Sequence, residues 1–325
     1  MPHQDRKAPG RAKRRLLIVL VGPTSSGKSE LAFKSAEILN GEIVNCDSVQ
    51  MYRLIEIGSA KPAPQQRRQI PHHLYDLVDP NQYFSAGRYM EEARKVCREI
   101  ADRARIPFVV GGTGLYLRAL LEGMFKGPGR SQDIRERLEK IGRRKGFDFL
   151  YRFLLKKDPQ AAGRIQPGDR VRIIRSLEVY LLTGRPISQL QQQREPLANF
   201  SILKIGLDLP RPDLYDRIDR RVSEMFSRGL LKEVQELLDK DYSPDCKGFE
   251  ALGYRHAFAA LRGELSQEEA IKRTQIDTRR YAKRQLTWFR REEGVHWIPG
   301  PGEDFSALQQ LLKLVGERRL GDSDL

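Results

Sequence analysis

Cysteine is scarce in this sequence. The 325 residues include three cysteines, Cys46, Cys97 and Cys246, and no two of them have CxxC spacing. A zinc site is therefore not expected, and such cysteine usage is typical of a reducing compartment. No apolar run approaches the ~18 residues that span a membrane. Residues 1–15 also lack the cleavage site of a secretory signal. We expect a cytoplasmic protein with no membrane partner.

Two motifs of nucleotide hydrolases are missing as well. The apolar run at residues 107–110 ends in Gly111-Gly112-Thr113-Gly114, where a Walker-B strand would end in aspartate. The sequence also has no [NT]-K-x-D motif that would specify guanine. These two absences weigh against a motor ATPase and against a GTPase switch.

Positive charge, in contrast, is abundant. The chain has 58 lysines and arginines against 43 acidic residues, a formal net charge of +15. Residues 126–200 carry 17 basic against 8 acidic residues, and residues 272–291 carry 8 against 1. A solvated face can be basic without a ligand, but this concentration in two segments favours a nucleic-acid surface.

The most specific motif is a glycine-rich loop between an apolar run at residues 16–21 and a helix-like segment at residues 30–39. It has the P-loop pattern G-x-x-x-x-G-K-[ST]. Its members are Gly22, Pro23, Thr24, Ser25, Ser26, Gly27, Lys28 and Ser29. The glycines let backbone N–H groups converge on an anion at the helix start, Lys28 adds a charge on the outer phosphate, and Ser29 is placed to hold Mg²⁺. A flexible Gly/Ser turn is the alternative. We predict a site for a di- or triphosphate.

Asp47 follows the next apolar run, residues 42–46. The carboxyl ends of parallel strands lie where ligands bind in open α/β sheets, so Asp47 is expected near the P-loop ligand. Its other interpretation is an N-cap of the following element. Strand, glycine turn and helix recur at residues 107–116, which predicts an α/β fold with a doubly wound parallel P-loop sheet and helices on both faces.

Residues 58–88 are rich in proline and lack periodicity, which is typical of a long functional loop or lid. This segment contains the adjacent histidines His72 and His73. In an extended segment these would point to opposite sides, and no carboxylate has useful spacing, so packing or capping is favoured over metal binding.

The strand signal disappears between residues 125 and 199, which we interpret as an all-helical, basic insertion. Helices are expected there at 133–144, 147–156, 169–182 and 187–194. The P-loop catalytic core would then comprise residues 16–124 and 200–325, behind a disordered basic tail at residues 1–15. A strand at 202–209 returns to the core.

Two long helices are expected in the second half of the core, at residues 213–240 and 267–291. On the first, Arg217 and Arg221 are four residues apart and share a face. On the second, an apolar seam (Ala282, Leu286, Phe289) lies opposite a basic stripe (Arg280, Arg284, Thr287, Arg291). Such a helix can lie on the protein while it contacts phosphates. A strand at 296–298 and a helix at 304–318 complete the chain.

Together these motifs resemble the tRNA dimethylallyltransferases (tRNA isopentenyltransferases) of the bacterial type, from about residue 16 to residue 298. The resemblance rests on the P-loop, on Asp47-Ser48-Val49-Gln50-Met51-Tyr52-Arg53, on Gly58-Ser59-Ala60-Lys61-Pro62 and on Pro71-His72-His73. It continues in Gly111-Gly112-Thr113-Gly114-Leu115-Tyr116, Arg175-Ser176-Leu177-Glu178-Val179-Tyr180, Gly253-Tyr254-Arg255 and Lys283-Arg284-Gln285-Leu286-Thr287-Trp288-Phe289-Arg290.

The resemblance implies that dimethylallyl diphosphate and tRNA are the substrates. The dimethylallyl group would move to N6 of the adenosine 3′ to the anticodon (position 37). The P-loop, with Mg²⁺ on Ser29, would hold the departing diphosphate, and Arg217 and Arg221 are candidates for a second clamp. Asp47 matches the general base, Thr113 would orient N6, and Lys28 would stabilise the charge of the leaving group.

The same family pattern implies a set of tRNA-binding residues. They are Asp47, Ser48, Val49, Gln50, Thr113, Arg135, Val171, Arg172, Ile173, Ile174, Arg175, Gly253, Tyr254, Arg255, Lys283, Arg284, Gln285, Trp288 and Arg290. We expect a monomer. Two alternatives stay open: a P-loop kinase or phosphotransferase acting on a nucleotide or small metabolite, and a nucleotide-gated RNA-binding protein.

Overall fold

The computed structural model describes residues 14–321, which divide into two compact units. One unit contains the residues up to Leu120 and those from Leu197 onward, and the other is Leu121–Pro196. Most of the tail expected at residues 1–15 lies outside the described residues. Arg15, however, belongs to the first strand and not to a tail.

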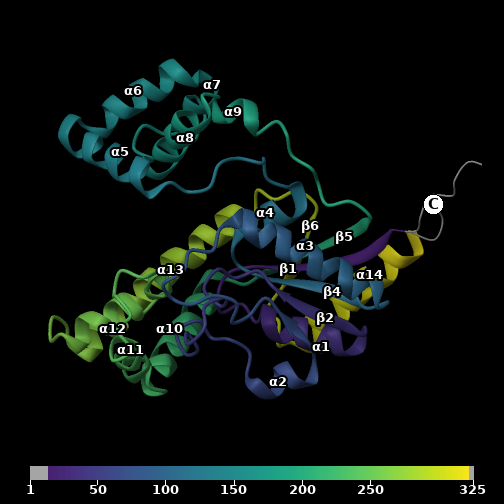
Figure 1. The fold of residues 1–325 in the computed structure, drawn as a ribbon. Helices are drawn as coiled ribbons and strands as arrows, with labels where there is room; N and C mark the ends of the chain where they lie inside the picture. The colour runs from purple at the N-terminus through teal and green to yellow at the C-terminus, as the bar shows by residue number, and fades with distance from the viewer. Residues whose placement is uncertain (1–13, 322–325) are drawn as a thin grey trace, which may run out of the picture. The chain divides into compact units, whose positions relative to one another are not determined.

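The first unit is built on one six-stranded sheet (Figure 1). The strands are β1 (Arg15–Val21), β2 (Gly41–Asn45), β3 (His72–His73), β4 (Ile106–Gly111), β5 (Phe200–Asp208) and β6 (Val295–Pro299). Their order is β3-β2-β4-β1-β5-β6, and every neighbouring pair is parallel. The central strands are buried on both sides, as continuous apolar runs such as Leu17–Val21 require.

Helices cover both faces of this sheet. Figure 1 shows α1 (Lys28–Ile38) and α14 (Phe305–Gly321) on one face, and α3 (Ala86–Asp102) and α4 (Gly114–Glu122) on the other. On the latter face the rings of Tyr89 and Tyr116 stack with centroids 4.4 Å apart. The predicted fold class, a doubly wound parallel P-loop sheet with helices on both faces, is confirmed.

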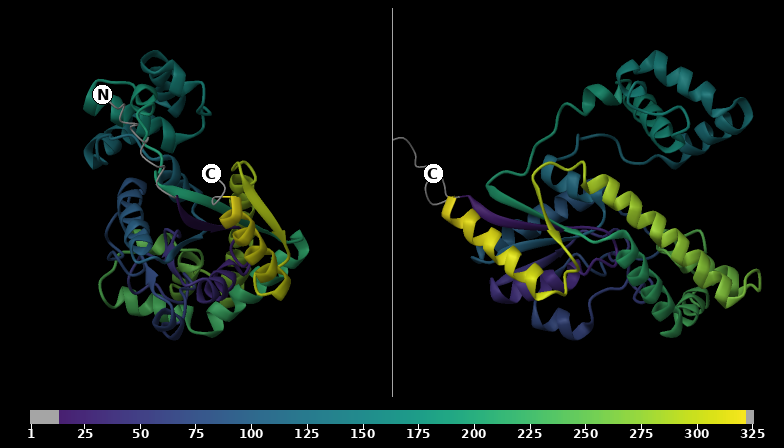
Figure 2. Two further views of the ribbon diagram at one scale, coloured as in Figure 1. Left: turned by 90° about the vertical axis from the view of Figure 1, so that its right-hand side faces the viewer. Right: turned by 180° about the vertical axis from the view of Figure 1, so that it is seen from behind.

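Four further helices pack together beside the sheet (Figure 2). They are α10 (Arg211–Ser227), α11 (Leu230–Leu238), α12 (Tyr254–Leu261) and α13 (Gln267–Phe289), with a 3-10 turn, η1 (Lys247–Glu250), before α12. The single long helix expected at residues 213–240 is therefore wrong. It ends at Ser227 because Gly229 adopts a left-handed conformation (φ 101°) that stops one helix and starts the next.

Residues 58–88 are more ordered than a structureless loop. They contain a short helix, α2 (Pro64–Gln69), and the edge strand β3, and Tyr52 pairs with Val78 in an isolated bridge. Buried Lys61 stabilises this segment: its ammonium donates to the Tyr52 carbonyl (2.7 Å) and to the carboxylates of Glu56 (3.0 Å) and Asp76. The expectation of an irregular lid is wrong for this part.

The second unit is all-helical, as expected. Its helices are α5 (Gln132–Lys145), α6 (Phe147–Lys157), α7 (Pro159–Ala162), α8 (Arg170–Thr183) and α9 (Ile187–Leu190). Leu138, Leu150, Leu154 and Leu177 lie in its main core. Helix α7 was not expected from the sequence, and α9 ends four residues before the expected Arg194. Within residues 14–321, no helix combines the length and apolar character that a membrane crossing requires.

Candidate active site

The P-loop forms the turn between β1 and α1, where its backbone conformation depends on glycine. Gly22 and Gly27 have positive φ angles of 151° and 85°, and Ser25 is also left-handed at 63°. A Cβ on Gly27 would lie 2.3 Å from the Glu303 carboxylate, so the position admits no side chain. The buried Oγ atoms of Ser25 and Ser26 have no hydrogen-bond partner among the described residues. Buried orphan hydroxyls in a strained turn are typical of a ligand site.

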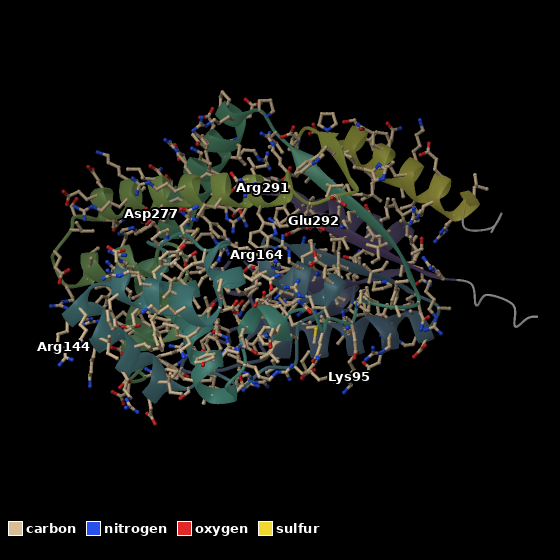
Figure 3. All side chains as sticks on the ribbon, turned by 90° about the horizontal axis from the view of Figure 1, so that it is seen from above. Lys95, Arg144, Arg164, Asp277, Arg291 and Glu292 are labelled. Carbon is tan, nitrogen blue, oxygen red and sulfur yellow. The ribbon has the colours of Figure 1, made fainter. Side chains whose placement is uncertain are left out.

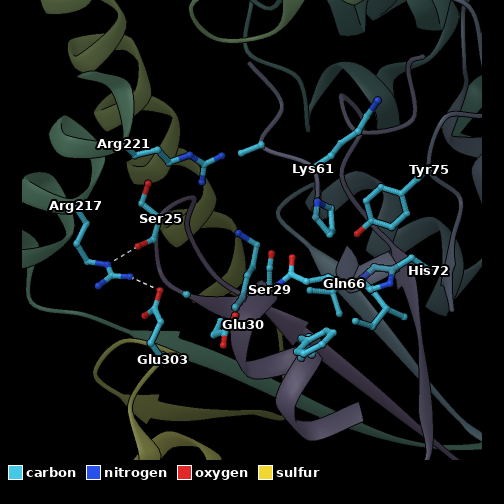
Figure 4. Close-up of a pocket in the computed structure, with 18 of the residues that line it drawn as sticks. Ser25, Ser29, Glu30, Lys61, Gln66, His72, Tyr75, Arg217, Arg221 and Glu303 are labelled. Atoms are coloured by element: carbon cyan, nitrogen blue, oxygen red, sulfur yellow. Dashed lines mark hydrogen bonds and ion pairs between the residues drawn. The ribbon is translucent and has the colours of Figure 1, made fainter. Parts of the chain in front are cut away.

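A cavity of about 460 Å³ opens in front of this loop (Figure 4). Its walls come from the P-loop, from α10, and from the segment that contains Lys61, His72 and Tyr75. Figure 4 shows Arg221 reaching toward the loop near Ser25. The cavity collects more basic than acidic side chains, as expected for a phosphate site: Lys28, Lys61, Arg217, Arg220 and Arg221 against Glu30, Glu224 and Glu303.

Two cations in the cavity are poorly compensated. Within residues 14–321, Lys28 donates only to the Pro23 carbonyl, at 3.1 Å. Burial lowers the pKa of Lys28 to about 8, with Asp47 opposing this shift and Arg221 adding to it. Burial also lowers the pKa of Arg221, against the influence of Asp47 and Glu224. The Arg221 guanidinium makes no hydrogen bond to any other described residue. Desolvated cations of this kind favour an incoming anion.

Arg217 has a different role from Arg221, although the two share a helix face. Its Nε donates to the Ser25 carbonyl (2.8 Å), and its terminal nitrogen pairs with Glu303 (2.5 Å), as the dashed lines in Figure 4 mark. Arg217 therefore holds the P-loop backbone in this structure, and its use as a diphosphate clamp stays a prediction. No sequence pattern indicated Glu303. Its neighbour Gly302 donates its N–H to the Ser26 carbonyl of the P-loop at 3.0 Å, and this contact places Glu303 beside the loop.

Asp47 follows β2 and interacts electrostatically with the cations Lys28 and Arg221. Its Oδ1 accepts the Val49 N–H at 2.9 Å in a local turn. No helix starts here, so Asp47 is not a helix N-cap. Its second carboxylate oxygen makes no hydrogen bond within residues 14–321. One oxygen therefore fixes the side chain and the other is free for a ligand.

Thr113 follows β4, the strand between β1 and β2. Its Oγ1 accepts the Ser48 N–H at 3.0 Å, and its N–H donates to the Cys46 carbonyl at 3.1 Å. The Tyr281 hydroxyl of α13 lies near this side chain. Lys28, Asp47 and Thr113 thus stand at the carboxyl ends of three adjacent strands, although 85 residues separate the first from the last. The ends of parallel strands are a frequent place for ligand sites in such sheets.

The candidate RNA residues on α13 divide between its two faces. Lys283, Arg284 and Arg290 are exposed, and Figure 3 labels Asp277 on this helix and Arg291 just after it. The apolar seam is confirmed at Ala282 and Phe289, which are buried. Gln285 is also buried, at 4% exposure, and its expected contact with tRNA stays a prediction. Trp288 is half-buried against Gly114 and stacks with Arg118 at 4.5 Å.

Gly253 and Tyr254 were expected to contact RNA, and this stays a prediction, although Tyr254 has a structural role here. Its side chain is fully buried, its hydroxyl donates to Glu233, and a Cβ on Gly58 would lie 1.9 Å from its ring. Gly253 is a left-handed turn (φ 100°) that starts α12. Glu233 also accepts the Ile57 N–H at 2.8 Å. These residues position the Gly58 segment, while Arg255 is exposed and stays a candidate contact.

Ser48, Val49 and Gln50 stay candidates around the target base, because all three are half-exposed beside Asp47. Gln50 Nε2 donates to the carbonyls of Ser59 (3.0 Å) and Ala60 (3.2 Å). This contact joins two of the sequence motifs, which the sequence alone could not place together.

In the helical unit, Val171 and Arg172 are exposed, whereas Ile173 and Ile174 lie in the hydrophobic core. The expected RNA contacts of all four residues stay predictions. Arg135 and Arg175 both pair with the fully buried Glu178, at 2.9 and 2.7 Å. Burial by itself raises the pKa of Glu178, but hydrogen bonds from these two arginines outweigh it and hold the pKa below its usual value. Glu178 lies within one of the sequence motifs, but its structural role was not predicted.

The fold and this site define a class, the proteins of the P-loop fold with a basic cavity in front of the glycine-rich loop. The model of the IPP transferase family matches residues 50–292. The tRNA dimethylallyltransferase of Koribacter versatilis is 48% identical over 92% of this chain and 98% of its own length. The tRNA dimethylallyltransferase of Geobacter sulfurreducens is 46% identical over 92% of this chain and 97% of its own length.

Solved structures agree with these sequence matches. The tRNA isopentenylpyrophosphate transferase of Bacillus halodurans superposes with a TM-score of 0.71 at 37% identity, covering 96% of this chain and 99% of its own. A eukaryotic dimethylallyltransferase captured acting on tRNA gives a TM-score of 0.76 at 29% identity. The match covers 92% of this chain and 78% of that one. The chain belongs to the IPP transferase family, that of the tRNA dimethylallyltransferases, and the predicted resemblance is confirmed.

Proposed function

We propose that this protein transfers the dimethylallyl group of dimethylallyl diphosphate to N6 of adenosine 37, next to the anticodon of tRNA, and releases diphosphate. The observation that carries the proposal is a cavity lined by Lys28 and Arg221, two cations that both interact electrostatically with Asp47, whose second carboxylate oxygen has no hydrogen-bond partner among the described residues. Such a site has cations for a leaving group and a base for an incoming amine.

The bond changes assign separate tasks to these residues. As the allylic C–O bond breaks, negative charge grows on the diphosphate. The P-loop N–H groups, Lys28 and Arg221 therefore stabilise the transition state more than the ground state. The N6–carbon bond forms, and Asp47 takes the proton that N6 loses. Thr113, held by the Ser48 N–H, would orient the amine. Because the carbon lies inside a cavity, the adenine must leave its stack to reach it.

Mg²⁺ fits this donor set. Ser29 lines the cavity at the first turn of α1, and its hydroxyl is a hard oxygen ligand. Mg²⁺ usually takes one or two protein oxygens and completes its shell with phosphate oxygens and water. When bound, it would neutralise charge on the diphosphate.

The direct test supplies purified protein with unmodified tRNA and isotopically labelled dimethylallyl diphosphate, or with γ-labelled ATP. We expect label from the prenyl donor on adenosine 37 and none from ATP. Transfer of phosphate alone would replace the proposal with the phosphotransferase alternative, which no observation here favours. Binding of RNA without any transfer would favour the nucleotide-gated RNA-binding alternative. The expected monomeric state is testable by light scattering, and the cytoplasmic location by cell fractionation.

A further inference from the structure

Gln285 links two loops that leave adjacent strands. Its Oε1 accepts the N–H of Thr24 in the P-loop at 2.8 Å, and its Nε2 donates to the carbonyl of Gly112, after β4, at 3.0 Å. Strands β1 and β4 are paired up to Val21 and Gly111, so these loops diverge where the pairing ends. One buried amide of α13 thus bonds both loops just after the sheet hydrogen bonds stop.

The glycines around Thr113 show how closely α13 approaches. A Cβ on Gly112 would lie 1.9 Å from Gln285 Nε2, and one on Gly114 would lie 2.2 Å from Trp288 Nε1. A side chain at either position would displace the Gln285 or the Trp288 side chain. The two glycines of Gly112-Thr113-Gly114 therefore make room for the side chains of α13 as well as forming the turn.

Three α13 residues form the row that makes these contacts. Tyr281, Gln285 and Trp288 follow the i, i+4, i+7 spacing of one helix face. Tyr281 lies near the Thr113 side chain, and Gln285 and Trp288 pack against the glycines on its two sides. Lys283 and Arg284, which are candidate RNA contacts, project from the same helix into solvent. A shift of α13 on RNA binding would therefore act on Thr113 and the P-loop together.

We propose that Gln285 is a positioning residue that holds the P-loop and Thr113 at one separation and couples tRNA docking on α13 to diphosphate binding. This inference rests on the proposed function. The Gln285 side chain is buried in this structure, and its two hydrogen bonds end on the two loops that the reaction must align. Removing them would leave the partly buried Thr24 N–H and the buried Gly112 carbonyl unpaired and let the loops drift. A misplacement of ~1 Å can cost about 10²-fold in rate.

The test compares Gln285→Met, which keeps the size and loses both hydrogen bonds, with Gln285→Glu, which keeps the acceptor for Thr24 and loses the donor to Gly112. Ile276→Ala, at an exposed site of the same helix, is the control. Calorimetry with inorganic diphosphate, alone and with a saturating anticodon stem-loop RNA, measures the coupling. Single-turnover transfer measures the rate.

For wild type and Ile276→Ala we expect bound RNA to change diphosphate affinity. For Gln285→Met we expect unchanged affinity for RNA alone, no coupling, and transfer slower by about 10²-fold. Gln285→Glu should lie between them, and it answers the same question if the Met variant does not fold. Wild-type rate and coupling in a folded Gln285 variant would overturn the inference. RNA affinity reduced as far as in Arg284→Ala would mean a direct contact. Absence of any prenyl transfer by wild type would instead refute the proposed function, while the coupling would still be measurable.

Discussion

Each unit of this protein contains a cluster of one carboxylate and two cations, and the clusters differ in how their charges are satisfied. In the helical unit, Glu178 accepts hydrogen bonds from Arg135, Arg175 and the Ser131 N–H. In the α/β unit, Asp47 lies near Lys28 and Arg221 but bonds neither. The same residue types therefore serve folding where their bonds are complete, and ligand binding where they are not.

The largest contrast is expected from removing each carboxylate charge. Asp47→Asn should lower the transfer rate by about 10²–10⁴-fold, the usual cost of a lost general base. Affinity for tRNA should stay within a few-fold, because the amide side chain keeps an oxygen that can accept the Val49 N–H. Single-turnover kinetics and filter binding measure the two quantities, and a variant that retains full turnover would remove Asp47 from the mechanism.

Glu178→Gln should act on stability instead. It leaves two partly exposed arginines without their shared partner, at a cost of about 3 kcal/mol to the helical unit, the lower end for a broken buried pair. Because the pKa of Glu178 is lowered by folding, the wild-type advantage should be present above its unfolded pKa and fade as the pH falls below it. Hydrogen exchange of α5 and α8 measures the loss. Equal protection in both proteins would contradict the pairing.

Arg221→Gln should separate binding from stability. Losing a hydrogen bond to a charged group costs about 1.5–3 kcal/mol, so the dissociation constant for diphosphate should rise by about 10- to 150-fold. The unliganded protein should not lose stability, since a desolvated cation without a bonded partner is removed. Arg217→Gln is the matched comparison, and it should lower the melting temperature because it frees Ser25 and Glu303. Destabilisation by the Arg221 variant would argue that its charge is satisfied.

The lowered pKa of Lys28 predicts that the protein takes up a proton when it binds a diphosphate. Its pKa of about 8 should rise when a diphosphate approaches, so binding above pH 8 should consume a proton and weaken as pH increases. Stability of the unliganded protein should rise over the same window, since the unfolded lysine keeps its proton to higher pH. Calorimetry of dimethylallyl diphosphate in buffers of different ionisation enthalpy detects the proton, because the terminal phosphate itself titrates near ~6. Lys28→Arg should show no uptake, and uptake in that variant would assign the proton elsewhere.

The smallest expected effect concerns the RNA surface. Arg284→Ala with Arg291→Ala should weaken tRNA binding and reduce the slope of log affinity against log salt by about 0.7–0.9 for each phosphate that is no longer neutralised. Diphosphate affinity in the absence of RNA should not change. An unaltered slope would place the RNA surface on other residues.

The sequence was informative where a local pattern determines the geometry. Buried apolar runs before Gly22, Asp47 and Gly111 located three strand ends, and parallel topology then placed Lys28, Asp47 and Thr113 together. It was not informative about polar partners distant in the chain. Nothing local distinguishes Gln285, which is buried, from its exposed neighbour Arg284, or reveals that Tyr254 bonds Glu233. Gly229 was missed because a single glycine inside a periodic segment is also compatible with a continuous helix.

The most direct test of the account is a crystal structure of the protein with diphosphate and an anticodon stem-loop. We expect the phosphates against the P-loop N–H groups, Lys28 and Arg221, with the flipped adenine amine within hydrogen-bond distance of Asp47 and Thr113. A diphosphate bound away from Lys28 and Arg221, or an Asp47 carboxylate directed away from the adenine, would contradict it.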